Sequence, residues 1–144
     1  MTSASIAEVL GGRRILGRQV KTLKDLAQLV RQGLPADALA VLGERLELNS
    51  TALSGKVGIP PRTLSRRFSH HSRLTAAESD RAVRMARVYA TAVEMLGNAG
   101  KAAAWLRTPN RALGGELPLD QLDTDLGARE VENLLGRIAY GVYS

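Results

Sequence analysis

The apolar positions of this chain recur every three or four residues, the spacing at which side chains share one face of an α-helix. One stripe follows Thr22, whose spacing to Asp25 predicts a capped helix start, and another follows Pro35, which suits a first helical turn. The stripes consist of Leu23, Leu26, Leu29 and Val30, and then of Leu39, Leu42 and Leu46. No run of useful length alternates between apolar and polar residues. The pattern therefore predicts an all-α fold.

The second half of the chain continues the helical pattern. Residues 75–78, Thr-Ala-Ala-Glu, form a capping box that predicts the start of a long helix. A helix over 98–106 is expected to stop before Pro109, and Thr124 is expected to cap the last helix. The expected buried stripes are Ala82, Met85, Ala86, Tyr89, Val93 and Leu96, and then Val131, Leu134, Leu135 and Ile138. Residues up to Gly17, in contrast, are weakly patterned and Gly-rich, which predicts a mobile arm or a short helix.

Residues 49–69, NSTALSGKVGIPPRTLSRRFS, have the pattern of a helix-turn-helix. Gly58 permits the left-handed backbone of a tight turn, and Pro61 suits the first turn of the second helix. Leu64 and Phe68, four residues apart, are expected to face the core together. The DNA-binding residues predicted on and beside the opposite face are Lys56, Arg62, Thr63, Ser65, Arg66, Arg67 and Arg73.

The charge of the chain is distributed unevenly. The net charge is +6, and residues 1–74 hold 12 Lys or Arg against 5 acids, whereas residues 75–144 hold 8 against 9. No acid occurs between Glu47 and Glu78, which predicts an uninterrupted positive field for phosphates. Because arginine fits the guanine edge in the major groove, Arg62 and Arg66 are expected to contact bases. The three flanking cations, which are Lys56, Arg67 and Arg73, are expected to contact phosphates. The alternative is a helical hairpin with a solvated basic face.

Composition and motifs exclude several classes of protein. The chain has no cysteine for a disulfide or a thiolate metal site, and its adjacent His70 and His71 face different directions on a helix. It has no signal-peptide pattern and no apolar run near the roughly 20 residues of a membrane span. It also lacks a Ser/His/Asp elbow and a glycine-rich phosphate loop. We therefore expect a soluble, cytoplasmic protein that is not an enzyme, with no cofactor, no metal and no membrane partner.

The final forty residues end in an apolar, aromatic segment. They run WLRTPNRALGGELPLDQLDTDLGAREVENLLGRIAYGVYS, with two of the chain's three tyrosines in the last five positions. Chain ends are usually polar and frayed, so this ending predicts that a protein partner covers it. Tyrosines supply large contact area together with a polar hydroxyl, which suits an interface. The alternative is that these tyrosines pack back on their own domain.

A fixed set of residues in this segment is typical of one family. The set is Trp105-Leu106, Pro109, Leu113-Gly114-Gly115, Pro118-Leu119-Asp120, Thr124, Gly127-Ala128, Glu130-Val131, Arg137-Ile138 and Tyr140-Gly141-Val142-Tyr143-Ser144. It resembles the toxin-binding domain of Xre/MbcA/ParS-type antitoxins. The upstream helix-turn-helix is similar to that of the same family, with Ser54 where such segments commonly have Ala.

The resemblance implies a type II antitoxin whose partner is a RES-domain toxin, an enzyme that degrades NAD⁺. It implies that the last residues of the antitoxin block the toxin's active site, and that the Xre/Cro-like helix-turn-helix binds operator DNA and represses the operon encoding both proteins. The toxin-binding residues carried over are Trp105, Arg137, Tyr140, Gly141, Val142, Tyr143 and Ser144. A homodimer within a larger complex is expected because helix-turn-helix proteins usually bind two half-sites.

These expectations divide the chain into an N-terminal arm at 1–19, a helix-turn-helix domain at 20–86 and a toxin-binding domain at 87–144. The competing hypothesis is a stand-alone helix-turn-helix repressor whose C-terminal domain serves dimerisation. That hypothesis accounts for the basic first half but leaves the apolar ending without a role.

Overall fold

The computed structural model describes residues 2–141, and over that range the chain is helical with no strand. The all-α prediction is therefore confirmed. The elements are α1 Ser3–Val9, α2 Gly12–Leu16, α3 Leu23–Gln32, α4 Ala36–Arg45, α5 Ser50–Val57, α6 Pro61–His70, α7 Ala76–Leu96, α8 Ala99–Leu106, the 3-10 helices η1 Arg111–Leu113 and η2 Pro118–Asp123, and α9 Asp125–Ala139. Among the described helices, none combines the length and the apolar character that crossing a membrane requires.

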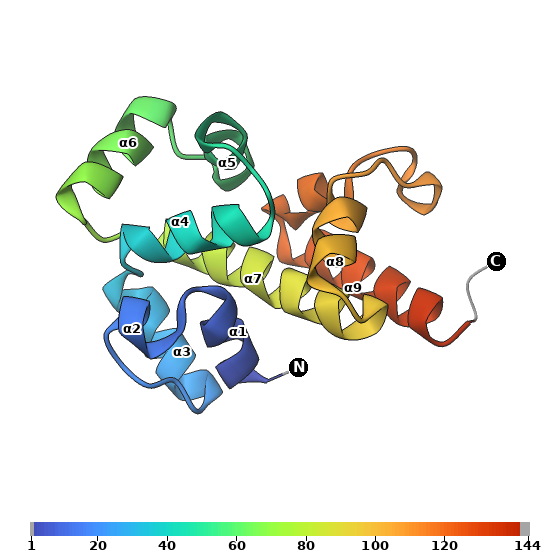
Figure 1. The fold of residues 1–144 in the computed structure, drawn as a ribbon, viewed down its shortest axis with the longest axis horizontal. Helices are drawn as coiled ribbons and strands as arrows, with labels where there is room; N and C mark the ends of the chain where they lie inside the picture. Colours follow the sequence, from blue (N-terminus) through green and yellow to red (C-terminus); the bar gives the residue numbers. More distant parts are fainter. Residues whose placement is uncertain (1, 142–144) are drawn as a thin grey trace.

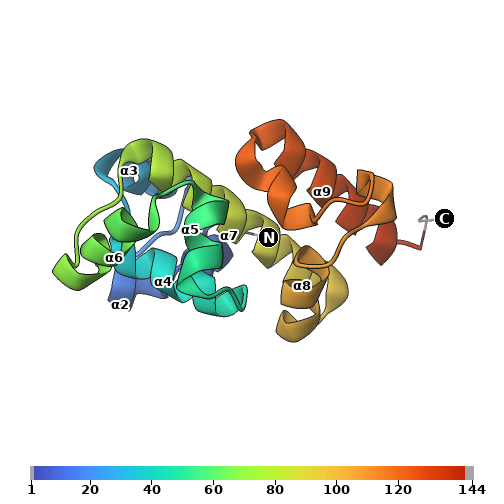
Figure 2. The same cartoon turned by 90° about the horizontal axis from the view of Figure 1, so that it is seen from above.

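Helix α7, 21 residues long, runs through the centre of the molecule. Helices α1 to α6 surround its first part, and α8 and α9 pack on its second part (Figures 1 and 2). Its small residues Ala82, Ala86 and Ala92 are fully buried, which lets neighbouring helices approach closely. One hydrophobic core extends from Ile6 in α1 to Leu135 in α9. The boundary predicted between residues 86 and 87 falls inside α7, so this helix contributes to both parts of the core.

Three helix starts follow the predicted capping residues. The side chains of Thr22 and Thr75 each accept a hydrogen bond from the third helical amide in a capping box, and Thr124 caps α9 in the same way without the box. At the end of α3, Gly33 has a φ of +93°, and a Cβ there would lie 2.2 Å from the carbonyl oxygen of Leu74. Only glycine fits this close approach.

The N-terminal residues form two short helices, so the helical alternative for this segment is the one observed. Thr2 and Ser5 make a capping box that starts α1. Leu10 and Leu16 are buried in the common core, at 0% and 3% exposure. Helices of seven and five residues are too short to show a clear apolar period, which is why the sequence pattern was weak here.

Candidate functional surfaces

Helices α5 and α6 form the helix-turn-helix that the sequence predicts. Asn49 caps α5 by accepting a hydrogen bond of 2.8 Å from the amide of Ala52. Gly58 ends α5 with a φ of 73°, and Ile59 is buried at 1% exposure in the turn. The buried hydroxyl of Ser54 donates a hydrogen bond to the carbonyl of Ile59. Serine in place of alanine therefore adds a bond across the turn and leaves no unsatisfied polar group.

The outer face of α6 carries the predicted base-reading residues. Arg62, Ser65 and Arg66 are exposed, and Thr63 is half-buried. Leu64, on the opposite face, is buried at 1% exposure. Within the part of the chain that the structure describes, neither arginine's guanidinium makes a hydrogen bond or an ion pair. Both are therefore available to a partner.

The three flanking cations, in contrast, are already engaged within the protein. Lys56 makes an ion pair with Asp120 of η2, and Arg67 makes one with Glu78 of α7. Arg73 donates a hydrogen bond of 2.6 Å to the carbonyl of Gly33. The sequence suggested an uninterrupted positive field, but folding brings acids from α7 and η2 against its edges. Among the seven predicted DNA-binding residues, the positive charges left unpaired within the described range are therefore those of Arg62 and Arg66, on the outer face of α6.

The Arg67–Glu78 ion pair involves the capping box that starts α7. Glu78 is the third residue of α7, and its carboxylate also accepts a hydrogen bond of 2.8 Å from the Thr75 amide. Burial opposes the charge on Glu78, but the bonds from the Thr75 amide and from Arg67 outweigh it and hold the pKa of Glu78 below its ordinary value. The side chains of Arg67 and Glu78 are only 19% and 16% exposed. This pair fixes the end of α6 against α7.

The last turn of α9 presents the predicted toxin-binding end. Val131, Leu134 and Leu135 are fully buried on the inner face of the helix. Arg137 is exposed, and Tyr140 is exposed to 77%. Gly141, also exposed, follows the helix end with a φ of 69°. Predicted residues 142–144 lie outside the described range. Trp105 of α8 is half-buried and packs against the core.

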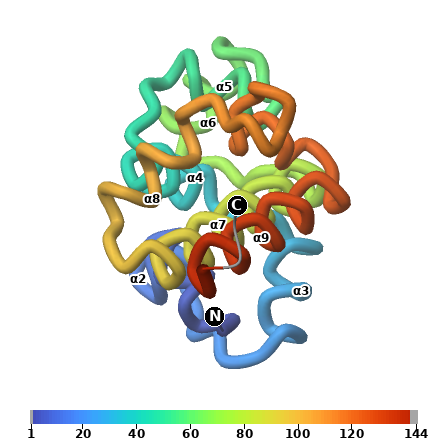
Figure 3. The backbone as a smooth tube through the Cα atoms, turned by 90° about the vertical axis from the view of Figure 1, so that its right-hand side faces the viewer, coloured from blue at the N-terminus to red at the C-terminus, as the bar shows by residue number. Residues whose placement is uncertain are grey.

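The two surfaces lie far apart on the molecule. In Figure 1, α6 is at one end of the long axis and the last turn of α9 is at the other. Figure 3, viewed from the end at which α9 finishes, shows α9 in front of α7 and the segment between α8 and α9 in front of the helix-turn-helix. The two surfaces therefore do not overlap.

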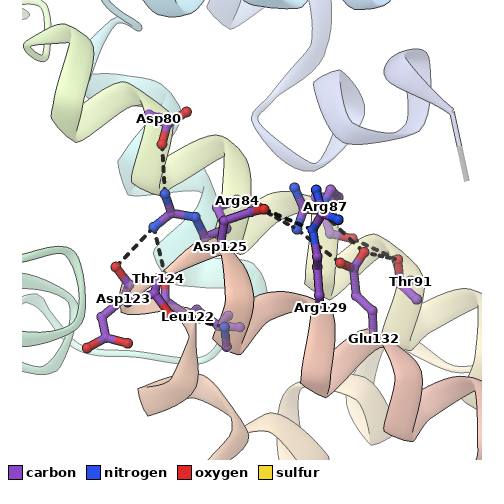
Figure 4. Close-up of polar contacts among 11 residues, drawn as sticks. Asp80, Arg84, Arg87, Thr91, Leu122, Asp123, Thr124, Asp125, Arg129 and Glu132 are labelled. Carbon is purple, nitrogen blue, oxygen red and sulfur yellow. Dashed lines mark hydrogen bonds and ion pairs between the residues drawn. The ribbon is translucent and has the colours of Figure 1, made fainter.

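Two arginines of α7, which the sequence did not single out, fix the start of α9 (Figure 4). Arg84 donates hydrogen bonds of 3.1 and 3.2 Å to the carbonyls of Leu122 and Asp123, at the end of η2. It also forms an ion pair of 2.8 Å with Asp80, one turn earlier in α7. The guanidinium thus satisfies carbonyl groups that a 3-10 helix leaves without partners at its end.

Arg87 joins α7 to α9 itself. Its guanidinium lies 3.0 Å from a carboxylate oxygen of Glu132 and 3.3 Å from one of Asp125 (Figure 4). Hydrogen bonds from Arg129 and Arg87 lower the pKa of Asp125 below its ordinary value. These partners are separated by 38 and 45 positions, so no local pattern in the sequence could indicate them.

Both halves of the chain match known protein families. Residues 25–87 match the antitoxin Xre-like helix-turn-helix domain, and residues 91–141 match the antitoxin Xre/MbcA/ParS C-terminal toxin-binding domain. The second match favours an antitoxin over a stand-alone repressor with a dimerisation domain.

Known antitoxins are similar to this chain along most of its length. Antitoxin Xre of Yersinia enterocolitica is 36% identical over 120 residues, which cover 83% of this chain and 81% of that protein. Antitoxin Xre of Pseudomonas putida is 35% identical over 149 aligned positions, covering 96% and 92%. A chain in the crystal structure of the M. tuberculosis MbcT–MbcA toxin–antitoxin complex is 26% identical, with a TM-score of 0.57 and coverage of 76% of this chain and 96% of that one. Fold, sequence and both matched domains thus agree, and the chain belongs to the Xre family of antitoxins.

Proposed function

We propose that this antitoxin neutralises a RES-domain, NAD⁺-degrading toxin by placing Tyr140 to Ser144 in its active site, and that its helix-turn-helix represses the operon encoding both proteins. The observation that carries the first part is the exposure of Tyr140, at 77%, on the end of a helix whose inner face is fully buried. The identity of the toxin rests on the family resemblance, and the M. tuberculosis relative in its complex supports a toxin as partner.

The geometry of α9 supports the blocking role. The core anchors the helix as far as Leu135, so Arg137 and Tyr140 are held on a rigid element and little conformational entropy is lost on binding. Tyrosine and arginine are the residues that most often dominate binding energy at interfaces. The guanidinium of Arg137 can pair with acidic groups of the toxin. Trp105, half-buried on neighbouring α8, is proposed as the edge of the contact surface.

The blocking role is tested by comparing Tyr140→Ala with Leu126→Ala. Both residues are large and exposed, Tyr140 to 77% and Leu126 to 80%. Leu126 lies in the first turn of α9 and Tyr140 directly follows its last residue, so 14 positions or roughly 20 Å of helix separate them. Tyr140→Ala, and deletion of residues 140–144, should weaken toxin binding and restore NAD⁺ degradation in a mixture of the two proteins. Leu126→Ala should neutralise like the wild type. Full inhibition by the truncated chain would contradict the blocking role.

For DNA, the proposal assigns base reading to Arg62 and Arg66, with Thr63 and Ser65 beside them. These arginines are exposed and unpaired among the described residues, and arginine donates two parallel hydrogen bonds to guanine. The flanking Lys56, Arg67 and Arg73 are proposed to face phosphates. A homodimer would place two copies of α6 in successive major grooves, about 34 Å apart.

DNA binding is tested by titrating an operator fragment with Arg62→Ala and Arg66→Ala, with Arg111→Ala as control. Arg111 is an exposed arginine of η1, so the control removes the same charge far from α6. Each α6 variant should bind about 5- to 150-fold more weakly, which corresponds to about 1–3 kcal/mol per bidentate base contact. Toxin neutralisation should be unchanged in all three variants. Equal operator affinities for the α6 variants and the control would refute the assignment.

A further inference from the structure

We propose that Asp120 of the toxin-binding domain is an intramolecular competitor of DNA, holding Lys56 in the position from which it would otherwise contact a phosphate. The inference rests on the proposed binding of operator DNA by α5 and α6. It adds that the C-terminal domain limits the affinity of this binding through one ion pair.

The pair connects two parts of the chain that are separated by 64 positions. Lys56 lies in the last turn of α5, and Asp120 lies in η2, which packs against α5. Their side chains are 24% and 46% exposed. Within the described part of the chain, the Asp120 carboxylate has Lys56 as its sole hydrogen-bond or ion-pair partner. Thr51, Gly55 and Asp123 line the shallow cleft around the pair.

A comparison with Arg67–Glu78 shows why the Lys56 pair is the one suited to exchange. Glu78 has a second role in the capping box of α7, and its pair with Arg67 is largely shielded from water. Breaking that pair would leave a partly buried carboxylate without its partner. Asp120, in contrast, is half exposed and can be solvated as soon as Lys56 leaves it. Lys56 can therefore move to another anion without disturbing the fold.

A DNA phosphate offers Lys56 the same chemistry as the Asp120 carboxylate: an anionic oxygen for an ammonium donor. Binding of Lys56 to DNA therefore replaces one ion pair by another. The free energy that the new contact contributes to DNA binding is reduced by the energy of the Lys56–Asp120 pair that is lost. In addition, the charges of Asp120 and Asp123 repel a phosphate backbone that approaches α5. Removing the Asp120 charge should strengthen DNA binding by about two- to fivefold, the range expected for a partly exposed ion pair.

The experiment measures the operator affinity of the full chain for Asp120→Asn and Asp123→Asn. Both residues are exposed acids of η2, and both substitutions raise the net charge by the same amount, but among the described residues only the Asp120 side chain is paired with Lys56. Asp120→Asn should bind about two- to fivefold more tightly than Asp123→Asn at the same salt concentration. Equal affinities for the two variants would overturn the proposal, because general electrostatics would then explain the whole effect.

Lys56→Gln, alone and combined with Asp120→Asn, identifies the cation involved. In the wild type, Lys56→Gln should weaken DNA binding only slightly, because Lys56 is already neutralised by Asp120. In the Asp120→Asn background it should remove the part of the gain that exceeds the gain from Asp123→Asn. Persistence of this excess gain without Lys56 would overturn the proposal while leaving the proposed DNA binding intact. Absence of operator binding by every variant, the wild type included, would refute the proposed function as well.

Discussion

Gly127, in the first turn of α9, lies so close to η2 that the methyl group of an alanine at this position would test how tightly the two elements pack. A Cβ at this position would lie 2.0 Å from the carbonyl oxygen of Gln121 and 3.0 Å from its carbonyl carbon. Both atoms belong to the backbone, so no side-chain rotation can relieve the overlap. Gly127→Ala must move α9 away from η2, and overpacking of this kind costs about 1–3 kcal/mol.

Gly136 provides the matched control on the same helix. No atom lies within 4 Å of a Cβ built there, and its backbone is helical. Replacing a helical glycine by alanine stabilises a protein by about 0.5–1 kcal/mol, and both substitutions share this gain. The difference in unfolding free energy between the two variants therefore isolates the clash at Gln121. We expect Gly136→Ala to be more stable than the wild type and Gly127→Ala to be less stable than Gly136→Ala by about 1–3 kcal/mol.

The assay is urea unfolding followed by far-ultraviolet circular dichroism, supported by thermal melts. For a chain of this length, each kcal/mol shifts the melting temperature by roughly 4 °C, so the two variants should melt about 4–12 °C apart. Equal stability of Gly127→Ala and Gly136→Ala would refute the reasoning, because it would mean that α9 does not contact the Gln121 backbone in solution.

Three further predictions concern the core, the titration of one carboxylate and the bridge from α7 to α9. Leu10→Ala should lower the unfolding free energy in urea by about 2–4 kcal/mol, because Leu10 is fully buried, whereas Leu23→Ala, at a position 74% exposed, should change it by less than about 0.5 kcal/mol. The lowered pKa of Glu78 means that its contribution to stability is full above the ordinary value of 4.5 and is lost as the pH falls through the lowered value. Glu78→Gln should therefore flatten the acid limb of stability against pH below the ordinary value of 4.5, and an unchanged limb would exclude Glu78 as its source. Arg87→Met should cost about 1–2 kcal/mol in urea unfolding because it leaves Glu132, 21% exposed, without its cation, and no loss would mean that solvent replaces Arg87 fully.

The local features of the fold were predictable from the sequence because each depends on residues within one or two turns. The caps at Thr22, Thr75 and Thr124 require only a hydroxyl at the right distance from the following amides. The stripe of Leu39 and Leu42 predicts the buried face of α4, and both side chains are fully buried. The same locality explains the weak prediction for the first seventeen residues, where the helices are too short for a period to emerge.

The electrostatics of the surfaces could not be predicted in this way, because the pairs that shape them join distant segments. The stretch between Glu47 and Glu78 contains no acid, yet Lys56 faces Asp120 and Arg67 faces Glu78 in the fold. Counting charges along the chain cannot detect such pairs, because Lys56 and Asp120, which are 64 positions apart, meet only when the helices pack. The exposed arginines of α6 were predictable because their orientation follows from the helical period alone.

The continuous core through α7 decides which variants can separate the two proposed activities. Since α7 packs against α1 and α3 as well as α8 and α9, a substitution that loosens α9 also removes support from the helix-turn-helix half. Under conditions that unfold a core variant such as Gly127→Ala, both activities are therefore expected to fall together, in proportion to the fraction of unfolded chain. Substitutions of exposed residues at the two ends of the molecule should not affect both activities through stability, because Tyr140 and Arg62 contribute little to the core. Selective loss of one activity in a surface variant thus reports the contact itself, whereas loss of both reports folding.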